Sequence, residues 1–185
     1  MKIILEATLP DILFPAIERH VTCNEMEFLA DLYGRRDNNE AIVNKVFPYG
    51  TMYANNAAVL VPEREEISDI TYNMANIVNG QRLGDLHSHV AGEGIMTAQQ
   101  AATKEQFIED FLKGVHYSRA DRKGMKKKYI YLILGFGHRP AFFDKEEIIT
   151  CPDGKSVFGV LPDYVYCISG WSCKGRFGKD KIIVC

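Results

Sequence analysis

The chain lacks the features that mark membrane and secreted proteins. No apolar run approaches the length of a membrane-spanning helix, about 20 residues, and Glu6 interrupts the N-terminal stretch too early for the core of a signal peptide. The five cysteines are odd in number and form no Cys-x-x-Cys pair, which favours reduced thiols over a disulfide framework. We therefore expect a cytoplasmic protein with no membrane partner.

The chain also has no large excess of positive or negative charge. The formal net charge is -2 at pH 7, so no overall basic field argues for nucleic acid as a partner. Six cations gather within residues 119–128, just before an apolar run. We interpret them as a solvated loop that guards the strand behind it, and the alternative is a docking site for an acidic partner.

Repeats and low-complexity segments are absent as well, which excludes repeat architectures and long disordered linkers. The 185 residues are 46% hydrophobic and 25% charged, an ordinary globular composition that can bury one core. We expect a single domain over residues 1–185.

The most informative segment carries two histidines one residue apart. It reads Gly-Asp-Leu-His-Ser-His-Val over residues 84–90 and ends an apolar run. In an extended strand, residues i and i+2 point to the same face, so His87 and His89 can direct both rings at one metal ion while Ser88 faces away. The spacing predicts a two-histidine metal clamp at the end of a strand.

The segment after the histidines predicts a loop and then a helix. Residues 91–94 are too rich in glycine to continue a strand, and Thr97 is suited to be the N-cap of a helix over 97–107, whose residues are good helix formers. The expected order is therefore strand, loop, capped helix.

This layout resembles the signature of the JAB/MPN metalloprotease (JAMM) family, His-Ser/Thr-His-x7-Ser-x2-Asp. On that resemblance His87 and His89 are zinc ligands, Thr97 takes the serine position, and Gln100 stands where the family has its third ligand, an aspartate. The run Glu-Phe-Leu-Ala-Asp-Leu-Tyr-Gly at 27–34 resembles the family's Glu-x-x-Gly-Leu-Leu-x-Gly, which makes Glu27 the candidate catalytic base.

The resemblance covers roughly residues 5 to 150 and implies an α/β fold of the MPN/JAB-like (cytidine-deaminase-like) type, in which helices flank a mixed central β-sheet. Apolar periodicity supports the same order of elements, with strands at 41–47, 57–61 and 129–134 and a helix at 65–78 that ends at Asn79-Gly80. From residue 148 onward, short apolar runs between turn signals predict a C-terminal β extension, with 157–161 and 164–168 as a hairpin.

The activity implied by the resemblance is hydrolysis of a peptide or isopeptide bond next to the C-terminal tail of ubiquitin or a ubiquitin-like protein. A Zn²⁺ ion with three protein ligands lowers the pKa of its water to about 7. Glu27 would accept the proton of that water and later hand it to the leaving amine. The hydroxyl of Thr97 would donate a hydrogen bond to the oxyanion.

Three alternatives stay open. A glutamine at position 100 is a neutral ligand, so Glu93 in the glycine-flanked loop is a substitute carboxylate for the ion. Without a metal, the chain would be a non-catalytic MPN-like interaction module that docks through helix 65–78 and the helix after the histidines. A hydrolase of small amides or phosphoesters on the same scaffold is a third reading. The oligomeric state is not encoded in these patterns.

Overall fold

The computed structural model describes residues 1–6, 8–22, 27–48, 53–54, 59–60, 73, 75–77, 79–89, 93–118, 121, 129–174 and 176–185. The elements along the chain are β1 (Lys2–Leu5), α1 (Leu9–Thr22), β2 (Leu29–Arg36), β3 (Glu40–Pro48), β4 (Tyr53–Ala54), β5 (Val59–Leu60), β6 (Gln81–His89), α3 (Glu93–Ala98), α4 (Lys104–Gly114), β7 (Ile130–His138), β8 (Glu147–Thr150), β9 (Val157–Val160), β10 (Tyr164–Lys174) and β11 (Arg176–Val184). No helix in these ranges is long and apolar enough to cross a membrane.

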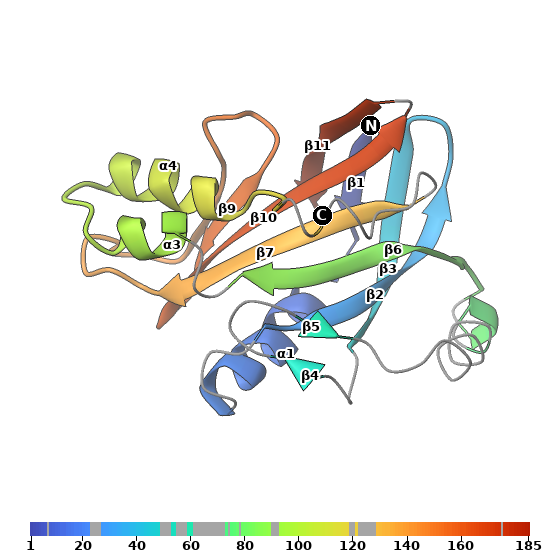
Figure 1. Cartoon of the computed structure of the whole chain (residues 1–185), viewed down its shortest axis with the longest axis horizontal. Coiled ribbons are helices and arrows are strands. Elements are labelled where there is room, and N and C mark those ends of the chain that lie inside the picture. Colours follow the sequence, from blue (N-terminus) through green and yellow to red (C-terminus); the bar gives the residue numbers. More distant parts are fainter. Residues whose placement is uncertain are drawn as a thin grey trace.

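Seven strands form a closed β-barrel in the order β11-β1-β3-β2-β6-β7-β10, which closes because β10 also pairs with β11. β10 is long enough to pair with two strands along the same edge (Figure 1). Its first half pairs with β9, for example Val165 with Val160, and its second half pairs with β11, for example Gly170 with Asp180. β9 and β8 therefore branch off the barrel wall.

Two hydrophobic cores hold this arrangement together. The first contains side chains from all seven barrel strands and from α1, including Leu5, Leu32 and Ile168, and fills the barrel interior. The second lies between the outer face of the wall and α3 and α4, where Phe107 and Phe111 of α4 meet Phe158 of β9. Because residues alternate along a strand, the inner face of the wall is apolar. The outer face can carry polar side chains where α3 and α4 do not cover it.

The expected fold, a central sheet flanked by helices of the MPN/JAB-like (cytidine-deaminase-like) type, is wrong. The sheet closes on itself, and α3 and α4 pack together on one outer region of the wall (Figure 1). The C-terminal strands are also more than an extension, because β10 and β11 are part of the barrel wall. Short apolar runs predict strands, but they carry no information on whether the last strand returns to the first.

The local predictions agree better with the structure. The strands expected at 41–47 and 129–134 correspond to β3 and β7, and the hairpin expected at 157–168 is the antiparallel pair β9 and β10. Of the strand expected at 57–61, only Val59–Leu60 is described. The helix expected at 65–78 lies mostly outside the described residues, as do the six cations of 119–128.

The helix expected to begin at Thr97 is wrong in its boundaries. α3 begins at Glu93 and contains Thr97, and the chain breaks before α4. Thr103 is the N-cap of α4, since its hydroxyl accepts a hydrogen bond from the backbone N–H of Gln106 (3.2 Å). The order is thus strand, short helix, turn, capped helix.

Candidate metal centre

The two histidines lie on the outer face of the barrel, at the end of β6. Ser88 between them is buried, and its backbone and hydroxyl exchange two hydrogen bonds with the backbone of Phe28, at 2.8 and 2.7 Å. This pairing fixes the register of β6 against β2, with His87 opposite Leu29. Continued along the strands, the same register sets His89 opposite Glu27. The alternation expected for His87, Ser88 and His89 is confirmed.

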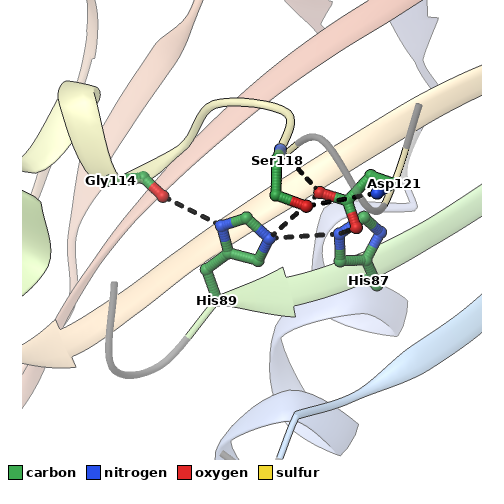
Figure 2. Close-up of polar contacts among 5 residues, drawn as sticks. All are labelled: His87, His89, Gly114, Ser118 and Asp121. Carbon is green, nitrogen blue, oxygen red and sulfur yellow. Dashed lines mark hydrogen bonds and ion pairs between the residues drawn. The ribbon is translucent and has the colours of Figure 1, made fainter. Parts of the chain in front are cut away.

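Asp121 joins the two imidazoles to form a group of three side chains that could hold a metal ion (Figure 2). The two Nε2 atoms are 3.2 Å apart, and the carboxylate oxygens of Asp121 lie 3.6 Å from Nε2 of His87 and 3.9 Å from Nε2 of His89. A tetrahedral ion with bonds of about 2.0–2.1 Å separates its ligand atoms by about 3.4 Å. These spacings are compatible with one bound metal ion, Zn²⁺ among others.

Neighbouring groups orient the ring of His89 and lower the pKa of His87. Nδ1–H of His89 donates a hydrogen bond to the carbonyl oxygen of Gly114 (3.0 Å), which leaves the lone pair on Nε2, facing His87 (Figure 2). Burial, and secondly the proximity of His89, lower the pKa of His87 to about 4. His87 is therefore neutral at pH 7 and available to bind a cation.

Asp121 is held by a reciprocal pair of hydrogen bonds with Ser118. The Ser118 backbone N–H donates to the Asp121 carboxylate (2.7 Å), and the Asp121 N–H donates to the Ser118 hydroxyl (3.1 Å). This exchange is the pattern of a capping box, which turns the carboxylate back toward the start of its own turn. The result is a carboxylate fixed beside the histidines.

Glu27 lies at the edge of this group and is only 7% exposed. Burial, and secondly the negative charge of Asp121, raise the pKa of Glu27 to about 7. A carboxyl group with such a pKa exchanges protons close to neutral pH, which suits a general acid or base. The residue predicted from the 27–34 run therefore lies near the histidines in space.

Further carboxylates line the same outer face of the wall. Asp85 lies two residues before His87, and burial raises its pKa to about 7, with Arg82 opposing and Asp31 and Asp121 reinforcing the shift. The Arg82 guanidinium binds the buried Asp31 carboxylate at 2.6 Å. Together these side chains give the surroundings of the histidines an excess of acidic groups, which favours a bound cation.

The other two sequence-predicted site residues lie at the surface. Thr97 is exposed on α3, and Gln100 is exposed in the following turn, where its N–H donates to the Thr97 carbonyl (3.0 Å). Glu93 begins α3, and its side chain lies outside what the structure describes. The roles given to Thr97 and Gln100 stay predictions, while a carboxylate missing from the sequence analysis, Asp121, is beside the imidazoles.

A signal for Asp121 is present in the sequence. Ser118-Arg119-Ala120-Asp121 has the Ser-x2-Asp spacing of the JAMM signature, but 28 residues, 90–117, separate it from His89 instead of seven. Those residues contain α3 and α4, which pack against each other and return the chain to the end of β6. A search with a fixed spacing misses it for that reason.

The Gly114 carbonyl offers a test of how His89 is held. A Cβ on Gly114 would lie 2.6 Å from Cγ1 and 2.8 Å from the backbone nitrogen of Ile95, so Gly114→Ala must push α3 and α4 apart and displace the carbonyl. We expect zinc affinity to fall about 10- to 100-fold, as when an outer partner of a metal-bound histidine is lost. Competition with a chelating indicator measures it.

Gly178→Ala is the matched control, because a Cβ there would meet nothing within 4 Å. It should leave zinc affinity unchanged. Equal affinities of the Gly114→Ala variant and the unmodified protein would contradict the role of the Gly114 carbonyl.

Comparisons with known proteins bear on the fold alone. No family model matches the chain, and no curated protein sequence matches it. A structural-genomics protein from Desulfitobacterium hafniense, solved in solution, is similar in structure, with a TM-score of 0.52 and 18% sequence identity over 99% of this chain and 92% of that one. At this identity the likeness concerns the shared fold alone.

Proposed function

We propose that this protein is a zinc-dependent hydrolase whose site is of the JAMM type, carried on a closed barrel. One observation carries the proposal: His87, His89 and Asp121 present three ligand atoms within 4.8 Å of one another, with the buried carboxyl group of Glu27 close by. Three ligands leave a fourth position for water, as catalytic zinc sites do.

Each residue has a part in this chemistry. A bound Zn²⁺ lowers the pKa of a water molecule to about 7 and polarises the carbonyl group under attack. Glu27 accepts the proton of the attacking water and delivers it to the leaving amine. His87 and His89 would hold the ion through their Nε2 atoms, and Asp121 would supply the negative charge that two imidazoles and the neutral Gln100 would lack.

The site also gains the serine of the signature. With Ser118 and Asp121 as the Ser-x2-Asp pair, the serine hydroxyl is the candidate donor of a hydrogen bond to the oxyanion, in place of Thr97. Support for this assignment is the pair of hydrogen bonds between Ser118 and Asp121. Under this proposal the missing aspartate at position 100 is no obstacle to zinc binding.

We propose a peptide or isopeptide bond next to the C-terminal tail of a ubiquitin-like protein as the substrate. This choice is supported by the resemblance in the His-Ser-His segment, the Glu27 run and the Ser-x2-Asp pair. An extended tail can reach such a site by main-chain pairing, which requires little of its side chains.

The experiment is zinc content together with turnover. Elemental mass spectrometry of protein purified without added metal should give near one zinc per chain, and a ubiquitin-like fusion should be cleaved until a chelator removes the metal. No zinc would overturn the proposal and favour the interaction module, which needs no metal. Cleavage of small amides with none of fusions would favour the third reading, and zinc without any cleavage would contradict the hydrolase.

A further inference from the structure

Far from the histidines in sequence, β8 ends the sheet. In the order of paired strands it is the last, and in the described ranges its one partner is β9, from Glu147 with Val160 to Thr150 with Val157. Among the described residues, no strand pairs with the backbone N–H and C=O groups on the other side of β8. Such an edge pairs readily with an extended segment of another chain.

An apolar pocket lies beside this edge. It encloses about 360 Å³, at the small end of the range for ligand pockets, between α1 and the strands β8 and β9. Leu13 and Val160 form part of its walls, and two large side chains that it shares with the surface, Phe14 and Ile148, are 70% and 55% exposed. A group that entered the pocket would cover both.

A glycine lies behind one wall of the pocket. Tyr166 of β10, which lines the pocket, lies across Gly159 of β9, and a Cβ on that glycine would sit 2.1 Å from Cζ of the ring. The absence of a side chain at position 159 lets the buried ring lie flat against the strand. The size of the pocket suits one large apolar side chain.

The pocket also has an acidic neighbour. Glu146 lines it and is exposed, and it precedes Ile148 by two residues, so both point to the same face of the extended chain. Glu147, which also lines the pocket, is already paired with Lys104 of α4. In the part of the chain that the structure describes, no cation is paired with Glu146.

We propose that the β8 edge and this pocket bind an extended segment of a partner protein with the pattern apolar-x-basic. Backbone hydrogen bonds add the segment to the sheet next to β8. Its apolar side chain enters the pocket beside Ile148, and a lysine or arginine two positions away faces Glu146. An anionic amphiphile such as a fatty acid would meet the Glu146 carboxylate instead. This surface is separate from the metal centre.

The test uses an acetylated peptide, Thr-Lys-Thr-Phe-Thr-Lys-Thr, which presents a lysine on either side of the phenylalanine and so serves both strand directions. It is titrated into ¹⁵N-labelled protein. We expect saturable amide shifts in 147–150 and α1, with a dissociation constant on the order of 100 μM. A peptide with serine for phenylalanine should bind at least about tenfold more weakly. Removal of zinc should change neither result, which separates this proposal from the proposed hydrolase.

Charge reversal makes the test specific. Glu146→Lys should weaken binding of the lysine peptide about tenfold. A second peptide, in which glutamates replace both lysines, should then be the better ligand of this variant. Phe14→Ala and Ile148→Ala should also weaken binding. Ile77→Ala and Met96→Ala are matched controls. Both side chains lie outside the β8 edge and its pocket and are 76% and 63% exposed, so these variants should bind the peptide like the unmodified protein.

Several results would overturn the proposal. They are shifts that do not saturate or that fall outside β8 and α1, equal binding of the lysine and glutamate peptides, and self-association through β8 in sedimentation experiments. The last would make a second copy of the chain the occupant. Binding of small apolar molecules with no binding of the peptide would equally count against it.

Discussion

Asp121→Ala is expected to remove zinc from the protein and with it all turnover. The variant keeps His87 and His89 but loses the anionic ligand 3.6 and 3.9 Å from their Nε2 atoms. Two neutral imidazoles leave the charge of the ion unbalanced, so affinity should fall more than 100-fold, beyond the about 10- to 100-fold effect of losing an outer partner. Elemental mass spectrometry and a competing chelator measure this directly.

Gln100→Ala is the matched comparison, because it removes the residue that the fixed seven-residue spacing assigns to the metal. It should retain zinc. Ser118→Ala removes the hydroxyl that accepts the Asp121 N–H but keeps the carboxylate, so it should keep zinc too. If Gln100→Ala lost the metal while Asp121→Ala kept it, the original assignment of Gln100 would be right.

Glu27→Gln should abolish amide cleavage and leave bound zinc unchanged. The amide has nearly the same shape as the carboxyl group but cannot take a proton from water, and loss of a general base lowers turnover about 10²- to 10⁴-fold. In the unmodified protein, turnover should rise with pH as Glu27 ionises, and a bound cation shifts that rise below pH 7. Glu27→Gln protein with full turnover would remove Glu27 from the mechanism.

The same substitution should stabilise the metal-free protein at alkaline pH. The folded-state pKa of Glu27 is about 7, against 4.5 ordinarily, so the folded state binds more protons than the unfolded state between these values. Its free energy of unfolding therefore falls as pH rises through that window and stays low above it. Glu27→Gln lacks this loss and should be more stable by about 3 kcal/mol at pH 8, with little difference at pH 4. Urea unfolding at both values tests it.

Sequence patterns were sufficient for the strand that carries the histidines, because residues i and i+2 of a strand share a face. Glu27 was selected by the resemblance of the 27–34 run, and β2, which begins at Leu29, brings it alongside β6, while its catalytic role stays a prediction. Patterns were insufficient for Asp121. The two packed helices α3 and α4 bring the chain back to the end of β6. Asp121 is therefore close to His89 in space although the two are far apart in the sequence.

The boundaries of those helices show how local signals compete. Thr97 and Thr103 are both residues that cap helices, and each is followed three residues later by a glutamine, Gln100 and Gln106, as in a capping box, so this local signal does not decide between them. The structure uses Thr103. Closure of the barrel had no comparable local signal, because it depends on β10 and β11 pairing with each other and on β11 reaching β1.

The pairing of β1 with β11 has a consequence for how the chain reaches its folded state. Lys2 pairs with Lys181 and Leu5 with Val184, so two strands from opposite ends of the sequence are hydrogen-bonded neighbours. During synthesis on the ribosome, β1 must wait until β11 (Arg176–Val184) has emerged before this neighbour exists. Contacts of such long sequence separation form slowly, and open strand edges recruit other chains meanwhile. We expect the pairing of β11 with β1 to be a late step of folding. Nascent chains should be prone to aggregation until β11 has emerged.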